Sequence, residues 1–77
     1  MSELDRVRWH CRRGLLELDL VLQRFNAAHL ERLPSHQLRA YIELLDYPDN
    51  DLLDLVMGRR ELPPGLRGEV VRLLRTV

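Results

Sequence analysis

The side chains most typical of zinc sites and of thiol or imidazole catalysis are one cysteine, Cys11, and three histidines, His10, His29 and His36. Zinc sites use closely spaced ligands such as CxxC or HExxH, and the chain contains neither pattern. A catalytic cysteine would also need a preorganised pocket, for which a chain of this size has little room. We therefore expect Cys11 to be a buried or half-buried structural residue, and we expect no metal site, no stably bound cofactor and no enzymatic activity.

Phosphate binding and carboxylate chemistry are not indicated either. The glycines do not have the spacing of a phosphate loop, since they stand at positions 14, 58, 65 and 68. Carboxylates cluster between Asp49 and Asp54, where helix capping and solvation explain them without chemistry.

Charge is balanced over the whole chain but separated along it. Twelve arginines offset twelve acidic residues, and lysine is absent. A net charge of zero argues against nonspecific binding to nucleic acid, which needs a surplus of positive charge. Arginines gather in the first fourteen residues, and an acidic run follows later, at Glu43, Asp46, Asp49, Asp51 and Asp54. Either solvated helix faces or a polarised surface for a protein partner explains this separation.

A chain of 77 residues is long enough for one small domain, so residues 1–77 are predicted to form a single helical domain. One cysteine cannot form an internal disulfide, which is typical of a protein in a reducing compartment. No apolar run has the length of a membrane span or the character of a signal-peptide core. We expect a cytoplasmic monomer that does not insert into membranes.

Prolines, glycines and capping residues divide the chain into five predicted helices, at about residues 2–13, 15–32, 35–47, 49–58 and 63–77. Ser2, Ser35 and Asp49 are expected to cap the first, third and fourth helices, and Pro63-Pro64 is expected to begin the fifth. Leucine, arginine and glutamate are good helix formers, and β-branched residues are scarce. The chain is therefore predicted to be all-α, a compact bundle of five short helices.

Apolar side chains recur at helical spacing, and these faces are predicted to form the core. The clearest face has i, i+3, i+4, i+7 spacing and consists of Leu38, Tyr41, Ile42 and Leu45. The second helix carries a face of Leu15, Leu18, Leu22 and Phe25. Gly68 interrupts the last helix and is expected to cost about 1 kcal/mol relative to alanine.

Two stretches resemble a known family. The stretch RVRWHCRRGLLELDLVLQRF is similar to the amino-terminal signature of the succinate dehydrogenase assembly factors, also called flavinators. The RGxxE motif of that family corresponds to Arg13, Gly14 and Glu17, with Trp9 and Arg12 before it. The stretch YIELLDYPDNDLLDLVMG is similar to the acidic segment of the family, although many relatives carry tryptophan where Leu55 stands.

The resemblance implies an assembly factor that binds the flavoprotein subunit of succinate dehydrogenase, and in bacteria often of fumarate reductase. Such proteins favour a conformation in which the partner's own histidine bonds to its FAD, so the reacting groups belong to the partner. The residues expected to contact the partner are Trp9, Arg12, Arg13, Gly14, Glu17 and Asp19, with Asp49 and Asp51 as candidate neighbours.

The segment from Arg13 to Glu17 also has a physical explanation. Gly14 is expected to be the C′ residue of the first helix with positive φ, and Glu17 is expected to reach back to a free N–H at the third helical position. Arg13 has no role in making such a turn. We therefore expect Gly14 to shape the corner, while Arg13 and Glu17 project from it toward the flavoprotein.

Two other functions are compatible with the sequence. The chain could be a protein-binding regulator, such as the antitoxin partner of a small membrane-associated toxin. A helix-turn-helix nucleic-acid binder would need a basic recognition helix. The third helix is a poor candidate, because Arg39 is accompanied by Glu43 and Asp46.

Overall fold

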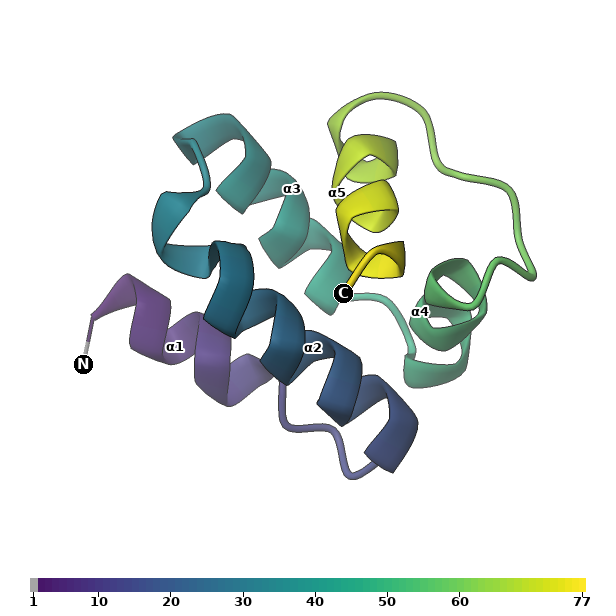
Figure 1. Cartoon of the computed structure of the whole chain (residues 1–77), viewed down its shortest axis with the longest axis horizontal. Coiled ribbons are helices and arrows are strands. Elements are labelled where there is room, and N and C mark those ends of the chain that lie inside the picture. The colour runs from purple at the N-terminus through teal and green to yellow at the C-terminus, as the bar shows by residue number, and fades with distance from the viewer. Residues whose placement is uncertain (1) are drawn as a thin grey trace.

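The structure, a computed structural model, describes residues 2–77, which form five α-helices and one short 3₁₀ helix (Figure 1). The elements are, in chain order, α1 (Glu3–His10), α2 (Leu16–His29), η1 (Leu30–Arg32), α3 (Ser35–Leu45), α4 (Asp49–Val56) and α5 (Leu66–Arg75). α1 lies beside α2, and a long loop leads from α4 back to α5. α5 packs against α2, α3 and α4, most extensively against α3. The prediction of an all-α bundle of five short helices is confirmed.

One cluster of buried side chains lies among the five helices, and it includes the apolar faces that the sequence predicts. Leu18, Leu22 and Phe25 of α2 and Tyr41 of α3 are fully buried. The rings of Phe25 and Tyr41 meet in a tilted contact with their centroids 4.7 Å apart, a favourable arrangement for aromatic side chains. The last two helices contribute Leu52, Leu55, Val56, Val70, Val71 and Leu74. This shared core fixes the surface on which the candidate site lies.

Two predicted N-caps are wrong, and a proline precedes the helix in both cases. Ser35 and Asp49 are the first residues of α3 and α4, and neither is the residue before the helix. Pro34 and Pro48 are the N-caps, with extended backbone and no side-chain capping bond. Proline lacks an N–H and has a fixed φ, so it suits the entry to a helix. The Asp49 carboxylate is thereby free to bind elsewhere in the fold.

Other helix ends show one confirmed cap and two shifted boundaries. The Ser2 hydroxyl accepts a hydrogen bond from the Asp5 amide at 3.1 Å, and the Ser2 amide donates to the Asp5 carboxylate at 3.4 Å, so the predicted Ser2 cap is confirmed and forms a capping box. α2 ends at His29 and continues as the 3₁₀ helix η1. α5 begins at Leu66, so the prediction that Pro63-Pro64 starts this helix is wrong.

Gly68 allows a close approach between α5 and the loop that precedes it. A Cβ atom built on Gly68 would strike the carbonyl oxygen of Pro63, and this obstacle is backbone that cannot rotate away. Gly68 has a low helix propensity and so weakens α5, but the packing of α5 against this loop requires a residue without a Cβ.

Arg13 joins three parts of the chain from inside the fold. Its guanidinium donates hydrogen bonds to the carbonyl oxygens of Leu45 and Tyr47, at the end of α3, and to the carboxylate of Asp49, at the start of α4. The distance from Nη1 to the Asp49 carboxylate is 3.0 Å, and the Arg13 side chain is only 9% exposed. We call these contacts the Arg13 bridge. Carbonyl groups at a helix C-terminus lack intrahelical partners and carry partial negative charge, so a cation is favourable there.

The expectation that Arg13 projects outward and has no role in the turn is therefore wrong. The planar guanidinium spreads its N–H donors over a fixed fork and so reaches acceptors on two helix ends, whereas the donors of a lysine all lie on one nitrogen. Its partners lie 32 to 36 positions away in the sequence, so no local pattern identifies them.

Gly68→Ala is expected to lower the free energy of unfolding by about 1–3 kcal/mol, because the added methyl group overpacks against Pro63. In an unobstructed helix the same change stabilises by up to about 1 kcal/mol, so the sign of the effect is the test. Urea denaturation measures it, with Glu69→Ala at the next, exposed position as control. A midpoint at or above that of the wild type would contradict the close approach.

Arg13→Ala is expected to lower the free energy of unfolding by about 2 kcal/mol, because two carbonyl groups and a carboxylate lose a charged donor. Arg12→Ala is the matched control, since Arg12 is exposed, and it should change stability by less than about 0.5 kcal/mol. A double-mutant cycle with Asp49→Ala should show coupling of about 1 kcal/mol. Equal urea midpoints for Arg13→Ala and Arg12→Ala would rule out the bridge.

Candidate protein-docking site

The docking corner, which we define as residues 12–17, joins the end of α1 to the start of α2. Cys11 is the C-cap of α1, and Leu15 is the N-cap of α2. Gly14 has a φ of +76°, which confirms the predicted left-handed conformation. The prediction that it is the C′ residue is wrong, because it lies further along the loop from Cys11. A Cβ at Gly14 would meet no atom within 4 Å, so the backbone alone requires glycine, and the corner remains uncovered.

Asp19 fixes the backbone of the docking corner. Its two carboxylate oxygens accept hydrogen bonds from the amides of Arg13, at 3.0 Å, and Gly14, at 3.2 Å. The prediction that Glu17 has such a capping role is wrong: Glu17 is the second residue of α2, and the N-cap of that helix makes no side-chain capping bond. The loop runs back over the side of α2 that carries Asp19. Asp19, expected to contact the partner, therefore uses its carboxylate within the chain.

Glu17 and Leu16 face solvent at the docking corner. Glu17 is exposed, and its carboxylate has no ion-pair partner among residues 2–77. Leu16 is 71% exposed because it lies outside the helical face that enters the core. The corner thus offers an anionic group, an apolar group and bare backbone close together in sequence. Contact of Gly14 and Glu17 with a partner stays a prediction. Leu16 is a further exposed residue of the corner, and it was not among the predicted contact residues.

Trp9 and Arg12 form a second exposed unit beside the corner. The guanidinium carbon of Arg12 lies 5.2 Å from the centre of the Trp9 ring, which is the geometry of a cation–π contact. Trp9 is 66% exposed, whereas Phe25 and Tyr41 are buried. Tryptophan and arginine are among the residue types that most often contribute binding energy at interfaces. The structure brings these two predicted contact residues together.

The acidic segment approaches the corner through one residue. Asp49 pairs with Arg13, so the start of α4 and the docking corner are neighbours, and 42% of the Asp49 side chain remains exposed. Asp51 instead pairs with Arg60 of the following loop, at 3.3 Å. Leu55 points into the core and is 2% exposed. Of the acidic candidates, the structure links only Asp49 to the corner.

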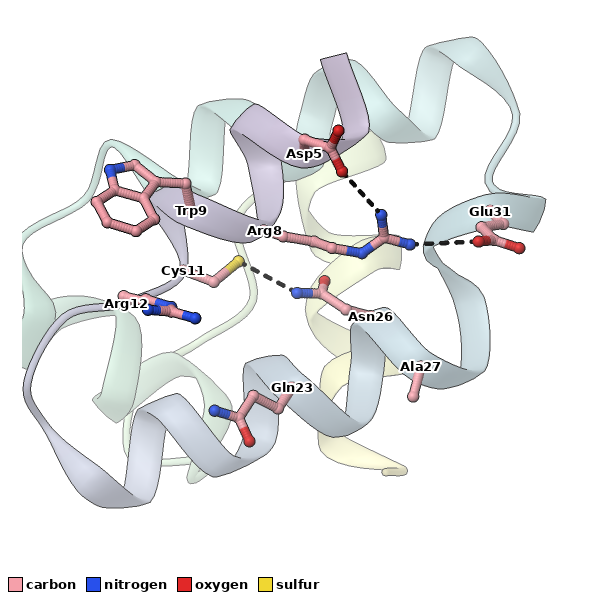
Figure 2. Close-up of a pocket in the computed structure, with 9 residues that line it drawn as sticks. All are labelled: Asp5, Arg8, Trp9, Cys11, Arg12, Gln23, Asn26, Ala27 and Glu31. Atoms are coloured by element: carbon pink, nitrogen blue, oxygen red, sulfur yellow. Dashed lines mark hydrogen bonds and ion pairs between the residues drawn. The ribbon is translucent and has the colours of Figure 1, made fainter. Parts of the chain in front are cut away.

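A groove of about 590 Å³ lies between α1 on one side and α2 and η1 on the other (Figure 2). Trp9 and Arg12 line it, and both were predicted site residues. The opposite wall, formed by Gln23, Asn26 and Ala27, was missed. Their i, i+3, i+4 spacing marks a face of α2 distinct from its apolar face, and this pattern could have indicated a second surface.

The floor of the groove rests on a polar contact that links Cys11 and Asn26, which line it, to Tyr41, which is buried behind them. Cys11 is buried, as expected, with its sulfur 3.3 Å from the Tyr41 hydroxyl oxygen and 3.5 Å from the Asn26 amide nitrogen. The Tyr41 hydroxyl lies 2.7 Å from the Asn26 side-chain oxygen and donates to it. Burial raises the pKa of Tyr41 well above its usual value, so the hydroxyl stays neutral and remains a donor. The floor is therefore a fixed base for the groups above it.

The arrangement suits the docking of another protein. Exposed apolar, aromatic and charged side chains stand on backbone that Asp19 and the Arg13 bridge keep in place, so binding orders little further structure. Among residues 2–77, no three His, Cys, Asp or Glu side chains lie where they could hold a metal ion together. In the same part of the chain, every helix is too short or too polar to cross a membrane.

Comparison with known proteins identifies relatives over most of the chain. A family model described as "Flavinator of succinate dehydrogenase" matches residues 5–77. The "FAD assembly factor SdhE" of Legionella pneumophila (strain Lens) is 45% identical over 73 residues, covering 95% of this chain and 91% of the relative. The protein of the same name from Ralstonia nicotianae is 40% identical over 77 residues, covering 94% and 80%. No solved structure shows significant similarity. The match includes the docking corner, the groove and the core alike, and the chain belongs to the family of flavinators of succinate dehydrogenase.

Proposed function

We propose that this chain binds the flavoprotein subunit of succinate dehydrogenase and promotes the covalent attachment of FAD to that subunit. Membership of the flavinator family and the names of the relatives support the proposal. The structural observation that carries it is the docking corner, where uncovered backbone at Gly14 and the exposed Glu17 stand on a loop that Asp19 fixes.

The residues of the RGxxE motif have different roles in this proposal. Gly14 lets the backbone of the partner approach closely, and Glu17 offers its carboxylate to donor groups of the partner. Arg13 does not touch the partner, but it positions the corner through its bridge to α3 and α4. Trp9 and Arg12 extend the contact surface along α1.

The acidic residues contribute unequally. Asp19 acts inside the chain by fixing the loop. Asp49 lies at the edge of the contact surface, because it is half-exposed and paired with Arg13. Asp51 contributes less, because Arg60 already neutralises it.

The chain acts by binding and supplies no reacting group of its own. The docking corner is preorganised, so less conformational entropy is lost when the partner binds. The binding energy favours the conformation of the flavoprotein in which its own histidine and its FAD are in reacting geometry, an effect of proximity and orientation. FAD belongs to the partner, and this chain does not retain it.

We further propose that the chain works as a cytoplasmic monomer and that it also promotes FAD attachment to the flavoprotein subunit of fumarate reductase. A monomer is supported by the burial of apolar faces from all five helices within one chain. The second partner is supported by the resemblance to a family whose bacterial members often act on both flavoproteins. Sedimentation of the purified chain, alone and with each flavoprotein subunit, tests both statements.

Glu17→Ala is expected to reduce covalent flavinylation at least tenfold while changing the free energy of unfolding by less than about 0.5 kcal/mol, as exposed positions usually do. The assay is co-expression with the flavoprotein subunit in a host that lacks its own assembly factor. Covalent flavin is scored by in-gel fluorescence, and melting temperatures are measured on the purified variants. Glu69→Ala is the matched control, because Glu69 is exposed in the first turn of α5, and it should keep full activity.

Two results would count against these statements in different ways. Flavinylation that does not change when the chain is omitted, in a host where the flavoprotein depends on help, would refute the proposed function. Full activity of Glu17→Ala would remove Glu17 from the contact surface and leave the function in place.

A further inference from the structure

Trp9 lines two hollows in the surface of the molecule. It is the only tryptophan in the chain, and it is 66% exposed. It lines the groove, and it also lines a smaller hollow together with Arg6, His10 and Arg12. A large exposed aromatic side chain flanked by arginines has the composition of a binding hot spot.

The charges around the groove are satisfied at one end and free at the other. At the η1 end, Arg8 pairs with Asp5 within α1 at 3.5 Å and with Glu31 at 3.3 Å, and the second pair joins α1 to η1 (Figure 2). At the corner end, Arg12 lies against Trp9, and no carboxylate of residues 2–77 pairs with it. A guanidinium with free N–H groups suits bidentate pairing with a carboxylate. The open end of the groove therefore favours an acidic group.

Apart from the amide of Gln23, the interior of the groove suits apolar groups. The polar atoms of Cys11 and Asn26 already bond to each other and to the hydroxyl of Tyr41, which is buried behind them. Ala27 presents only a methyl group on the α2 wall, which leaves room above it. A space of about 590 Å³ lies within the usual range for pockets that enclose a small ligand, so it can hold a few side chains.

We propose that the groove binds an extended segment of the flavoprotein subunit in which a carboxylate side chain is followed by apolar side chains. The carboxylate pairs with Arg12 at the open end, and the apolar side chains pack against Trp9 and over Ala27. The proposal rests on the proposed function, and it names the chemistry that the partner presents there. Arg12 belongs to both the docking corner and the groove, so one partner can cover the two surfaces without a break.

Filling the groove is the most direct test. Ala27→Phe places a bulky side chain in the groove from an exposed position, so it leaves the core and the charge unchanged. Ala28→Phe is the matched control, because Ala28 is also exposed on α2 but does not line the groove. Titration of the flavoprotein subunit with each full-length variant should give a Kd at least tenfold above the wild-type value for Ala27→Phe and an unchanged Kd for Ala28→Phe.

Changing the charge of Arg12 tests the proposed carboxylate of the partner. Arg12→Glu should raise Kd at least tenfold, and Arg12→Lys, which keeps the charge but loses the bidentate fork, should raise it less. Arg72→Glu, an equal charge change at an exposed position on α5, should leave Kd within twofold of the wild type. A chain labelled with 5-fluorotryptophan gives one fluorine resonance, from Trp9, and adding unlabelled flavoprotein should shift it.

The outcomes separate this proposal from the function on which it rests. A selective effect of Ala27→Phe and Arg12→Glu, together with the fluorine shift, supports the groove as the binding site. Wild-type affinity for both variants, in a chain that still promotes flavinylation, overturns the groove and leaves the proposed function standing. Equal weakening by Ala27→Phe and Ala28→Phe also overturns it, because contact would then depend on α2 as a whole. A wild-type chain that fails to bind the flavoprotein overturns both.

Discussion

The geometry of this surface depends on the hydrogen bonds and the ion pair that the Arg13 guanidinium makes. It satisfies carbonyl groups at the end of α3 and the carboxylate at the start of α4, so the α3–α4 turn and the docking corner keep a fixed relation. The contact is not fully satisfied, because Arg13 Nε is buried without a hydrogen-bond partner in the described chain. An unpaired buried donor is costly. The charged bonds of the two Nη atoms offset this cost, since bonds to or from an ionised group are the stronger ones.

The helical spacing of the apolar residues predicted most of the fold, because core formation depends on which residues share a face. Leu18, Leu22 and Phe25 are buried as their spacing indicates. The capping residues were harder to predict. Asp49 is a good N-cap by type, but Pro48 takes that position and the Asp49 carboxylate binds Arg13. A local rule cannot weigh a partner from another part of the chain.

Residue types identified many members of the candidate site, but they did not identify what each residue does there. Three arginines of the first segment have the same charge but different environments: Arg8 is paired with two carboxylates, Arg12 lies on an aromatic ring, and the side chain of Arg13 is only 9% exposed. Counting charge along the sequence treats them alike. The exchange of roles between Glu17 and Asp19 has a similar origin, because two carboxylates close in sequence compete for the same amides and the path of the loop decides between them.

The distance along the chain between Arg13 and Asp49, 36 positions, bears on when the docking corner takes shape during folding. Contacts of such separation form only after the entropy of closing a long loop has been overcome, so they follow the local helical turns. A growing or cleaved chain that stops before α4 contains every residue of the RGxxE motif but lacks the Asp49 carboxylate that completes the Arg13 bridge. A partner that recognises the corner by its shape therefore distinguishes finished molecules from fragments.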